Sequence, residues 1–387
     1  MTTSGRHFLQ IPGPSNVPDS VLHAIAMPTI DHRGPEFQEL FTHVLDGMAA
    51  IFRTKNQVVI YPATGTGAWE AALVNTLNPG DEILCCETGH FSSLWAGMAE
   101  KWGLKPTVIA GDWRTGADPE KIREALAADI DHRFKAVCVV HNETSTGVTS
   151  RIPEIRRAID DTGHPALFMV DTISSLGSVD YRHDEWGVDV TVSGSQKGLM
   201  LPPGLSFNAV SDKALEAHQR STLPKPVWNW TDMLEAGANG RTPYTPNTNM
   251  LYGLRESLRL LNEEGLDTVF ARHSRYGKAT RAAVEGWGLE VLCTNPDEYS
   301  PVLTAVIMPE GFDADELRRI ILDRFNMSLG AGLSKLAGTV FRIGHLGDLS
   351  PLTLAGTLSG VQMGLQLAGV TVDTKGLDAA LDILRDG

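Results

Sequence analysis

The chain has 387 residues, of which 42% are apolar and 21% charged, and its formal net charge is −14. This composition is typical of a globular protein, and the length suits one large domain and a smaller one. The negative charge, with no block of five or more like charges, argues against a nucleic-acid partner. The N-terminus lacks an apolar signal-peptide core and no run of 18 apolar residues exists, so we expect a cytoplasmic protein without a membrane span.

The first 20 residues predict an ordered arm. Residues 11–18 contain three prolines and a glycine, which exclude a regular helix or a central strand. From residue 58 onward, short apolar runs alternate with helix-length amphipathic patterns such as residues 119–128. The predicted strands are residues 58–61, 82–86, 107–110, 136–140, 166–170, 188–192 and 206–210. This alternation predicts an α/β fold with a mainly parallel sheet flanked by helices.

The last third of the chain repeats the α/β pattern on a smaller scale. Two long helices, about 249–264 and 266–287, are followed by strands at 302–308 and 340–343 and helices at 314–325 and 351–368. We therefore divide the chain into an arm (1–20), a large domain (21–265) and a small C-terminal domain (266–387).

Lys197 and Asp171 are the residues with the clearest chemical signal. Lys197 follows a strand and a small-residue turn, while Asp171 ends the neighbouring apolar strand 166–170. A lysine at a loop tip is usually just solvated. A lysine and an aspartate at the carboxyl ends of adjacent strands, however, are two parts of a pyridoxal phosphate (PLP) site, in which the lysine forms the Schiff base and the aspartate pairs with the pyridine nitrogen.

Other polar segments fall at the same predicted edge of the sheet. The segment 62–73, PATGTGAWEAAL, places Gly65 and Thr66 where a helix start binds anions, although an ordinary capped helix fits the same letters. The segment also resembles the dinucleotide-binding motif GxGxxG, but Glu70 stands in place of the third glycine. Phe91 is either a core residue or an aromatic surface for a flat cofactor. Thr144 lies in a polar loop, and we assign Trp69 to the core because a helix on a sheet buries one stripe.

Arg342 lies inside the apolar strand 340–343, where an unpaired charge is costly. It either forms a salt bridge with an internal acid or grips a substrate carboxylate through two hydrogen bonds. No metal site is predicted, because the acidic and histidine residues 183–185 are consecutive and cannot converge on one ion. The four cysteines have no CxxC spacing, which argues against a zinc site or a disulfide framework and favours a reducing compartment.

The chain resembles the fold-type I, class V PLP-dependent aminotransferases, in particular the alanine– and serine–glyoxylate aminotransferase family. The resemblance covers nearly the whole length and depends on a set of specific motifs: IPGPSNVP, PATGTGAWEAAL, HNETSTGV, ALFMVDTISSLGS, DEWGVDVTVSGSQKGLMLPPG, PYTPNTNMLYGLRESL and VFRIGHLG. Two features depart from it. His32 stands where plant relatives carry Tyr, and the tail 373–387 lacks a GSGVAAA-like stretch.

The resemblance implies roles for individual residues. Lys197 is the lysine that forms the Schiff base, and Asp171 is the partner of the pyridine nitrogen. Phe91 stacks on the ring, Ile173 packs on its other face, and Thr144 approaches the ring's 3-oxygen. The phosphate is held by Gly65, Thr66 and Gln196, joined by Tyr244 and Thr245 from the second subunit of a homodimer. Arg342 binds the α-carboxylate, and the pocket is bordered by the neighbouring subunit's His32 and Arg33.

The function implied is a ping-pong transaminase that moves the amino group of an L-amino acid, best L-serine, to glyoxylate, giving hydroxypyruvate and glycine. Alanine, aspartate or a ureido acid remain alternative donors on the same scaffold. A cysteine desulfurase-like reaction is a weaker alternative that would need a mobile nucleophilic cysteine, of which Cys293 is the only candidate in the smaller domain. A noncatalytic PLP-binding protein is the alternative from another class.

Overall fold

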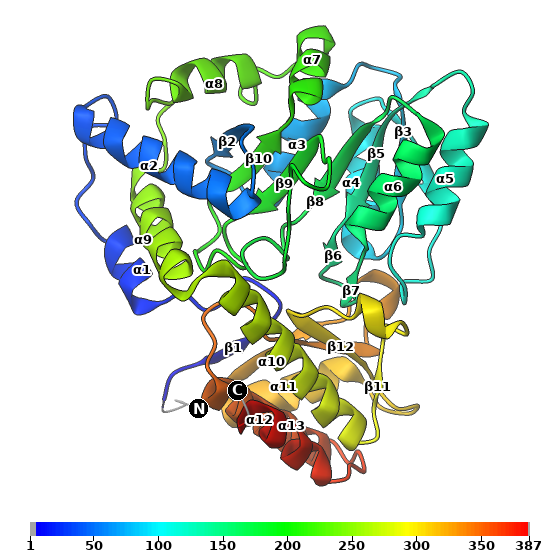
Figure 1. The fold of residues 1–387 in the computed structure, drawn as a ribbon. Coiled ribbons are helices and arrows are strands. Elements are labelled where there is room, and N and C mark those ends of the chain that lie inside the picture. The colour runs from blue at the N-terminus through cyan, green and yellow to red at the C-terminus, as the bar shows by residue number, and fades with distance from the viewer. Residues whose placement is uncertain (1–4, 386–387) are drawn as a thin grey trace.

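A seven-stranded sheet forms the centre of the larger part of the molecule, in the order β2-β10-β9-β8-β5-β3-β4 (Figure 1). The computed structural model of the protein describes residues 5–385. The strands of this sheet are β2 (Gln57–Tyr61), β3 (Glu82–Cys86), β4 (Lys105–Ile109), β5 (Phe134–Val140), β8 (Leu167–Asp171), β9 (Val190–Gly194) and β10 (Ser206–Val210). The seven predicted strands are all present, with bounds that differ by at most two residues.

Strand direction in this sheet is mainly parallel, as predicted, with one exception. β10 runs antiparallel to both of its neighbours, β2 and β9. A parallel pair needs a crossover connection of a dozen or more residues, usually a helix, whereas the link from Gly194 to Ser206 contains none. The chain therefore reverses directly after β9, and this reversal places Lys197 at the carboxyl end of that strand.

Helices cover both faces of the sheet and form two apolar cores. One core is shared by α2 (Pro35–Phe52), α5 (Pro119–Ala128), α6 (Ile152–Thr162) and α9 (Thr248–Glu264). The other is shared by α3 (Gly65–Thr76), α4 (His90–Lys101), α7 (Asp212–Arg220) and α8 (Trp230–Gly237). Successive strand residues alternate between the two cores: Val58 and Ile60 belong to the first, Val59 and Tyr61 to the second.

A second, five-stranded sheet lies below the first in Figure 1, in the order β1-β13-β14-β12-β11. Its strands are β1 (Phe8–Gln10), β11 (Glu290–Val291), β12 (Leu303–Ile307), β13 (Met327–Ala331) and β14 (Val340–Gly344). Helices α10 (Leu266–Gly286), α11 (Ala314–Phe325), α12 (Pro351–Leu367) and α13 (Lys375–Arg385) build its core. The fold class, an α/β fold with a large and a smaller part, is thus confirmed.

The N-terminal arm connects the two parts. β1 pairs in parallel with β13 of the small sheet, and Asn16 bridges to Gly347, whereas α1 (Asp19–Ile25) packs on α9 of the large part. We retain the boundaries near residues 20 and 265 as a proposal. They are supported by α9 and α10, which meet at Gly265 and contribute mainly to different cores.

The remaining elements are short. They are β6 (Asn142–Glu143), β7 (Val148–Thr149) and the 3₁₀ turns Pro296–Glu298 and Ser334–Leu336. Most of the divergent tail forms α13, which packs along α10. Residues 386–387 lie outside the described part of the chain. Within residues 5–385, no helix combines the length and the apolar character needed to cross a bilayer.

Two glycines offer a matched test of this packing. A Cβ at Gly286 in α10 would lie 2.5 Å from the Gly376 Cα of α13, whereas a Cβ at Gly97 in α4 would have no neighbour within 4 Å. We expect Gly286→Ala to lower the free energy of unfolding by about 1–3 kcal/mol through overpacking. Gly97→Ala should raise it by about 0.5–1 kcal/mol through helix propensity. Thermal unfolding of both variants is the measurement, and an unchanged midpoint for Gly286→Ala would contradict the tight helix contact.

Candidate active site

A cavity of about 280 Å³ opens at the carboxyl ends of β5, β8 and β9, where parallel sheets bind ligands. We call it the Lys197 cavity. The structure brings eight of the ten predicted cofactor residues to its wall: Gly65, Thr66, Phe91, Thr144, Asp171, Ile173, Gln196 and Lys197. Asp171 is the last residue of β8, and Lys197 lies three residues beyond the end of β9.

Lys197 is buried beneath the N-terminal arm. Its Nζ donates a hydrogen bond to the Pro12 carbonyl, and its own carbonyl accepts one from Ser15 Oγ at 2.9 Å. Gly13 presses on the lysine so closely that a Cβ there would lie 2.7 Å from Nζ. Burial lowers the pKa of Lys197 to about 7, and the positive charge of Arg342 acts in the same direction. A large fraction of the amine is therefore neutral, and nucleophilic, near pH 7.

Asp171 faces the same cavity and is also buried. Its Oδ1 accepts a hydrogen bond from the Ile173 N–H at 2.6 Å, and its Oδ2 accepts one from Trp69 Nε1 at 2.8 Å. Burial raises the pKa of Asp171 to about 7, while these two hydrogen bonds act to lower it. The carboxylate is thus available as a buried partner for a protonated ring nitrogen.

The core assignment of Trp69 was incomplete. Trp69 packs in the core against Trp95, with ring centroids 6.0 Å apart, but it also lines the Lys197 cavity and bonds Asp171. It lies four residues after Gly65, so both are on one face of α3. This four-residue spacing is the feature of the sequence that could have predicted Trp69 beside the anion site.

The start of α3 provides an anion-binding surface. No side chain caps this helix start at Thr64, so the first N–H groups of the helix are free for a ligand. A Cβ at Gly65 would come within 2.2 Å of Ile173 Cδ1, so any larger residue there would displace the Ile173 side chain at the cavity wall. Beside it, the side-chain NH2 of Gln196 can donate to an anion, while its buried Oε1 has no hydrogen-bond partner in the described part of the chain. This end of the cavity suits a phosphate group.

Glu143 is a site residue that the sequence analysis did not single out. Its carboxylate is fully buried and accepts hydrogen bonds from the N–H groups of Phe91 and Ser92, at 3.3 and 3.1 Å, and from Ser145 Oγ at 2.6 Å. It therefore caps the start of α4 and fixes the backbone of Phe91. The only feature of the sequence that could have pointed to Glu143 is its place in the polar loop after β5.

Arg342 is buried next to the cavity without lining it. Its Nε donates to the Ala331 carbonyl and its Nη1 to the Thr144 carbonyl, both at 2.7 Å. Within residues 5–385 no Asp or Glu forms a salt bridge with it, so the internal salt bridge considered above is absent. Burial lowers the pKa of Arg342 to about 10, which leaves it charged at neutral pH.

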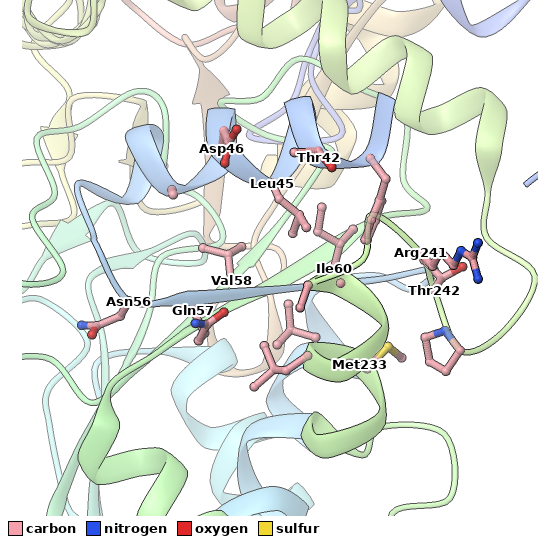
Figure 2. Close-up of a pocket in the computed structure, with 17 residues that line it drawn as sticks. Thr42, Leu45, Asp46, Asn56, Gln57, Val58, Ile60, Met233, Arg241 and Thr242 are labelled. Atoms are coloured by element: carbon pink, nitrogen blue, oxygen red, sulfur yellow. The ribbon is translucent and has the colours of Figure 1, made fainter. Parts of the chain in front are cut away.

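Besides Arg342, four predicted site residues lie outside the Lys197 cavity in the single chain. Tyr244 and Thr245 line a separate small cavity over β2, and the Tyr244 hydroxyl donates to the Pro226 carbonyl at 2.6 Å. His32 and Arg33 lie in the turn between α1 and α2. Figure 2 shows a neighbouring cavity of about 230 Å³ between α2, β2 and α8, with Arg241 and Thr242 at one end; it contains none of the predicted site residues.

Cys293 also lies outside the Lys197 cavity. The thiol is buried, points its Sγ at the Asn295 carbonyl 3.5 Å away, and has a pKa raised to about 11 by burial. A protonated, enclosed thiol is a poor nucleophile. This position does not support the cysteine desulfurase alternative.

The groups in the Lys197 cavity fit the PLP that the sequence predicts. An amine, a buried carboxylate and an anion-binding helix start line one enclosed space. They match the aldehyde, ring nitrogen and phosphate of this cofactor in chemical type.

The lowered pKa of Lys197 can be measured directly on the cofactor-free protein. Competitive labelling with trace acetic anhydride, read by peptide mass spectrometry, should reach half of its maximum at Lys197 near pH 7, because only the neutral amine reacts. A lysine-containing peptide in the same tube is the control and should still gain label above pH 9, given its usual pKa of about 10.4. Parallel curves for the two would show that the amine is not perturbed.

Comparisons with known proteins identify the family of this chain. Residues 7–336 match the protein family described as Aminotransferase class-V. The chain is 47% identical to the serine–glyoxylate aminotransferase of Methylorubrum extorquens, over 99% of this chain and 97% of that protein. It is 45% identical to the L-aspartate–glyoxylate aminotransferase of Paracoccus denitrificans, over 91% and 88%. The crystal structure of the ureidoglycine–glyoxylate aminotransferase of Bacillus subtilis superposes with a TM-score of 0.91 at 28% identity, covering 99% of both chains. With the lysine, the carboxylate and the helix start in one cavity, this protein belongs to the class-V aminotransferase family.

Proposed function

We propose that this enzyme is a PLP-dependent aminotransferase that transfers the amino group of L-serine to glyoxylate, producing hydroxypyruvate and glycine in a ping-pong reaction. One observation carries the chemistry: a buried lysine with a pKa near 7 shares a cavity with a buried aspartate. The choice of substrates is supported by 47% identity to a serine–glyoxylate aminotransferase over nearly the whole chain.

The cofactor is held, in this proposal, by the residues at the carboxyl edge of the sheet. Asp171 pairs with the ring nitrogen, Phe91 and Ile173 contact the two ring faces, and Thr144 approaches the 3-oxygen. The phosphate is bound at the start of α3, by Gly65, Thr66 and Gln196. Support comes from the cavity itself, which all of these residues line.

When bound, PLP supplies an aldehyde carbon that accepts the amino group and a ring that draws electrons from the donor's Cα. The chain's own groups handle the protons. The Lys197 amine, neutral in part at pH 7, would take the proton from the donor's Cα and deliver it to the cofactor carbon that accepts the amino group, and it would move a proton the opposite way when glyoxylate is the acceptor. The arm above Lys197 excludes water from this transfer, because Gly13 and Pro14 close the cavity on that side.

Arg342 binds the α-carboxylate in this proposal. The amino acid and the oxo acid carry the same carboxylate, so one guanidinium serves both halves of the reaction. The Ala331 and Thr144 carbonyls hold the Arg342 guanidinium in place. This supports the role, because the guanidinium is already oriented before substrate binds.

The active unit that we propose is a homodimer. Tyr244 and Thr245 would complete the phosphate site of the partner subunit, and His32 and Arg33 would border the partner's substrate pocket. Support comes from their position: all four lie outside the Lys197 cavity of their own chain, and Tyr244 is 40% exposed although its hydroxyl bonds the Pro226 carbonyl.

The cysteines at 85, 86, 138 and 293 are all unpaired, which supports a cytoplasmic location.

L-Aspartate is a second candidate donor, because the Paracoccus relative, named for that substrate, is almost as similar at 45% identity. A single test separates the donors. Each ¹⁵N-labelled amino acid (serine, aspartate or alanine) is mixed with glyoxylate and the holoenzyme, and ¹⁵N-glycine is measured by mass spectrometry. We expect L-serine to react fastest, whereas faster label transfer from aspartate would replace the donor and leave the reaction class intact.

Lys197→Ala is the control for that assay. Turnover should fall by about 100- to 10,000-fold, the usual contribution of a general acid–base group. Unchanged turnover in this variant would refute the proposed chemistry.

Arg342→Ala tests the carboxylate site. We expect the KM values for L-serine and for glyoxylate to rise together by about 10- to 100-fold, as for the loss of hydrogen bonds to a charged group. Arg318→Ala is the matched control, because Arg318 also donates to a β13 carbonyl, that of Leu329, but pairs with Asp315. A change in the KM of only one substrate would argue against a shared carboxylate site.

A further inference from the structure

We propose that Trp69 is a positioning residue that holds the Asp171 carboxylate, through its indole N–H, in the place where it meets the ring nitrogen of PLP. This inference rests on the proposed function, since it assigns the pairing of Asp171 to that cofactor. Trp69 Nε1 lies 2.8 Å from Asp171 Oδ2, and both side chains are almost closed to solvent, at 2% and 3% exposure.

The hydrogen bond matters because Asp171 has no water to solvate it. A buried carboxylate needs fixed donors, and within the described chain this one has two: the Ile173 N–H on Oδ1 and Trp69 on Oδ2. The Ile173 N–H belongs to the backbone two residues away and follows Asp171 wherever it moves. Trp69 comes from a different element, α3, and so fixes the carboxylate relative to the rest of the cavity.

The charged and titratable groups near Asp171 come from other elements. Glu143 of β6 disfavours the ionised carboxylate, whereas Lys197, after β9, favours it, and Tyr181 also senses its charge. Charge therefore acts on Asp171 in both directions, and the two hydrogen bonds add stabilisation of the ionised form. Without Trp69, the carboxylate becomes a stronger base and takes a larger share of the proton between it and the ring nitrogen.

Trp69 is itself held rigidly. Its ring stacks on Trp95 with an interplanar angle of 12°, and its backbone lies one turn into the helix whose start forms the anion site. The same helix therefore sets two distances at once, that to the phosphate and that to Asp171. A cofactor that spans both ends would be gripped by one rigid element.

Trp69→Phe removes the donor and keeps an aromatic ring, and Trp95→Phe is the matched control. Trp95 is equally buried, but its Nε1 has no hydrogen-bond partner within the described chain. Three quantities are measured for each: the dissociation constant of PLP from the apoprotein, the pH midpoint of the bound cofactor's visible absorbance, and kcat and KM for L-serine.

For Trp69→Phe we expect PLP affinity and kcat to fall by about tenfold or more, the effect of losing one hydrogen bond to a charged group. The absorbance midpoint should shift, and the KM for L-serine should change by less than about threefold, since the substrate carboxylate is not touched. Trp95→Phe keeps the Trp69 donor and an aromatic ring for it to stack on, so its three values should stay much closer to the wild type than those of Trp69→Phe. Equal values for the two variants would overturn the role of Trp69.

A double variant keeps the test decisive if Trp69→Phe also lowers stability. In an Asp171→Ala background no acceptor remains for the Trp69 N–H to hold, so Trp69→Phe should cause no further loss of kcat or PLP affinity. A further tenfold loss there would show that Trp69 acts elsewhere and would overturn the inference. A wild-type protein that fails to bind PLP would instead refute the proposed function on which it rests.

Discussion

Burial of an acid and a base in one cavity is the constraint on which this active site depends. Asp171 and Lys197 are both nearly closed to water, where an ionised group is costly unless fixed partners replace its hydration. The burial that raises one pKa and lowers the other is a property of the enclosure, not of the residue types. An amine that is neutral near pH 7 requires this environment, because a solvated lysine would be almost fully protonated.

The enclosure is built from segments that are far apart in the sequence. The arm begins in the small sheet, where β1 pairs with β13, and then crosses to the large sheet, where the Ser15 hydroxyl and the Pro12 carbonyl contact Lys197. The arm can pass this close to β14 because residue 344 is a glycine. A Cβ on Gly344 would lie 2.3 Å from the Ile11 carbonyl oxygen of the arm. Motion of the small sheet would therefore be transmitted to the cover of the reactive lysine.

Two helix starts complete the site in different ways. The start of α3 has no side-chain cap and leaves its N–H groups to a ligand, whereas the start of α4 is satisfied internally by the buried Glu143. One positive helix end is thus open to a phosphate, and the other is neutralised to hold Phe91 at the cavity wall. The same backbone chemistry serves binding in one case and positioning in the other.

Local signals in the sequence determined the order of the main elements and predicted the roles of Lys197, Asp171 and Gly65, because apolar runs, turn residues and helix starts are encoded over a few neighbouring residues. Only the tertiary structure decided the direction of β10, the pairing of β13 with the arm, and the partners of Trp69 and Glu143. Each of these depends on groups distant in sequence: strand direction follows from the path of the connection, and a buried hydrogen bond from which side chains the packing brings together.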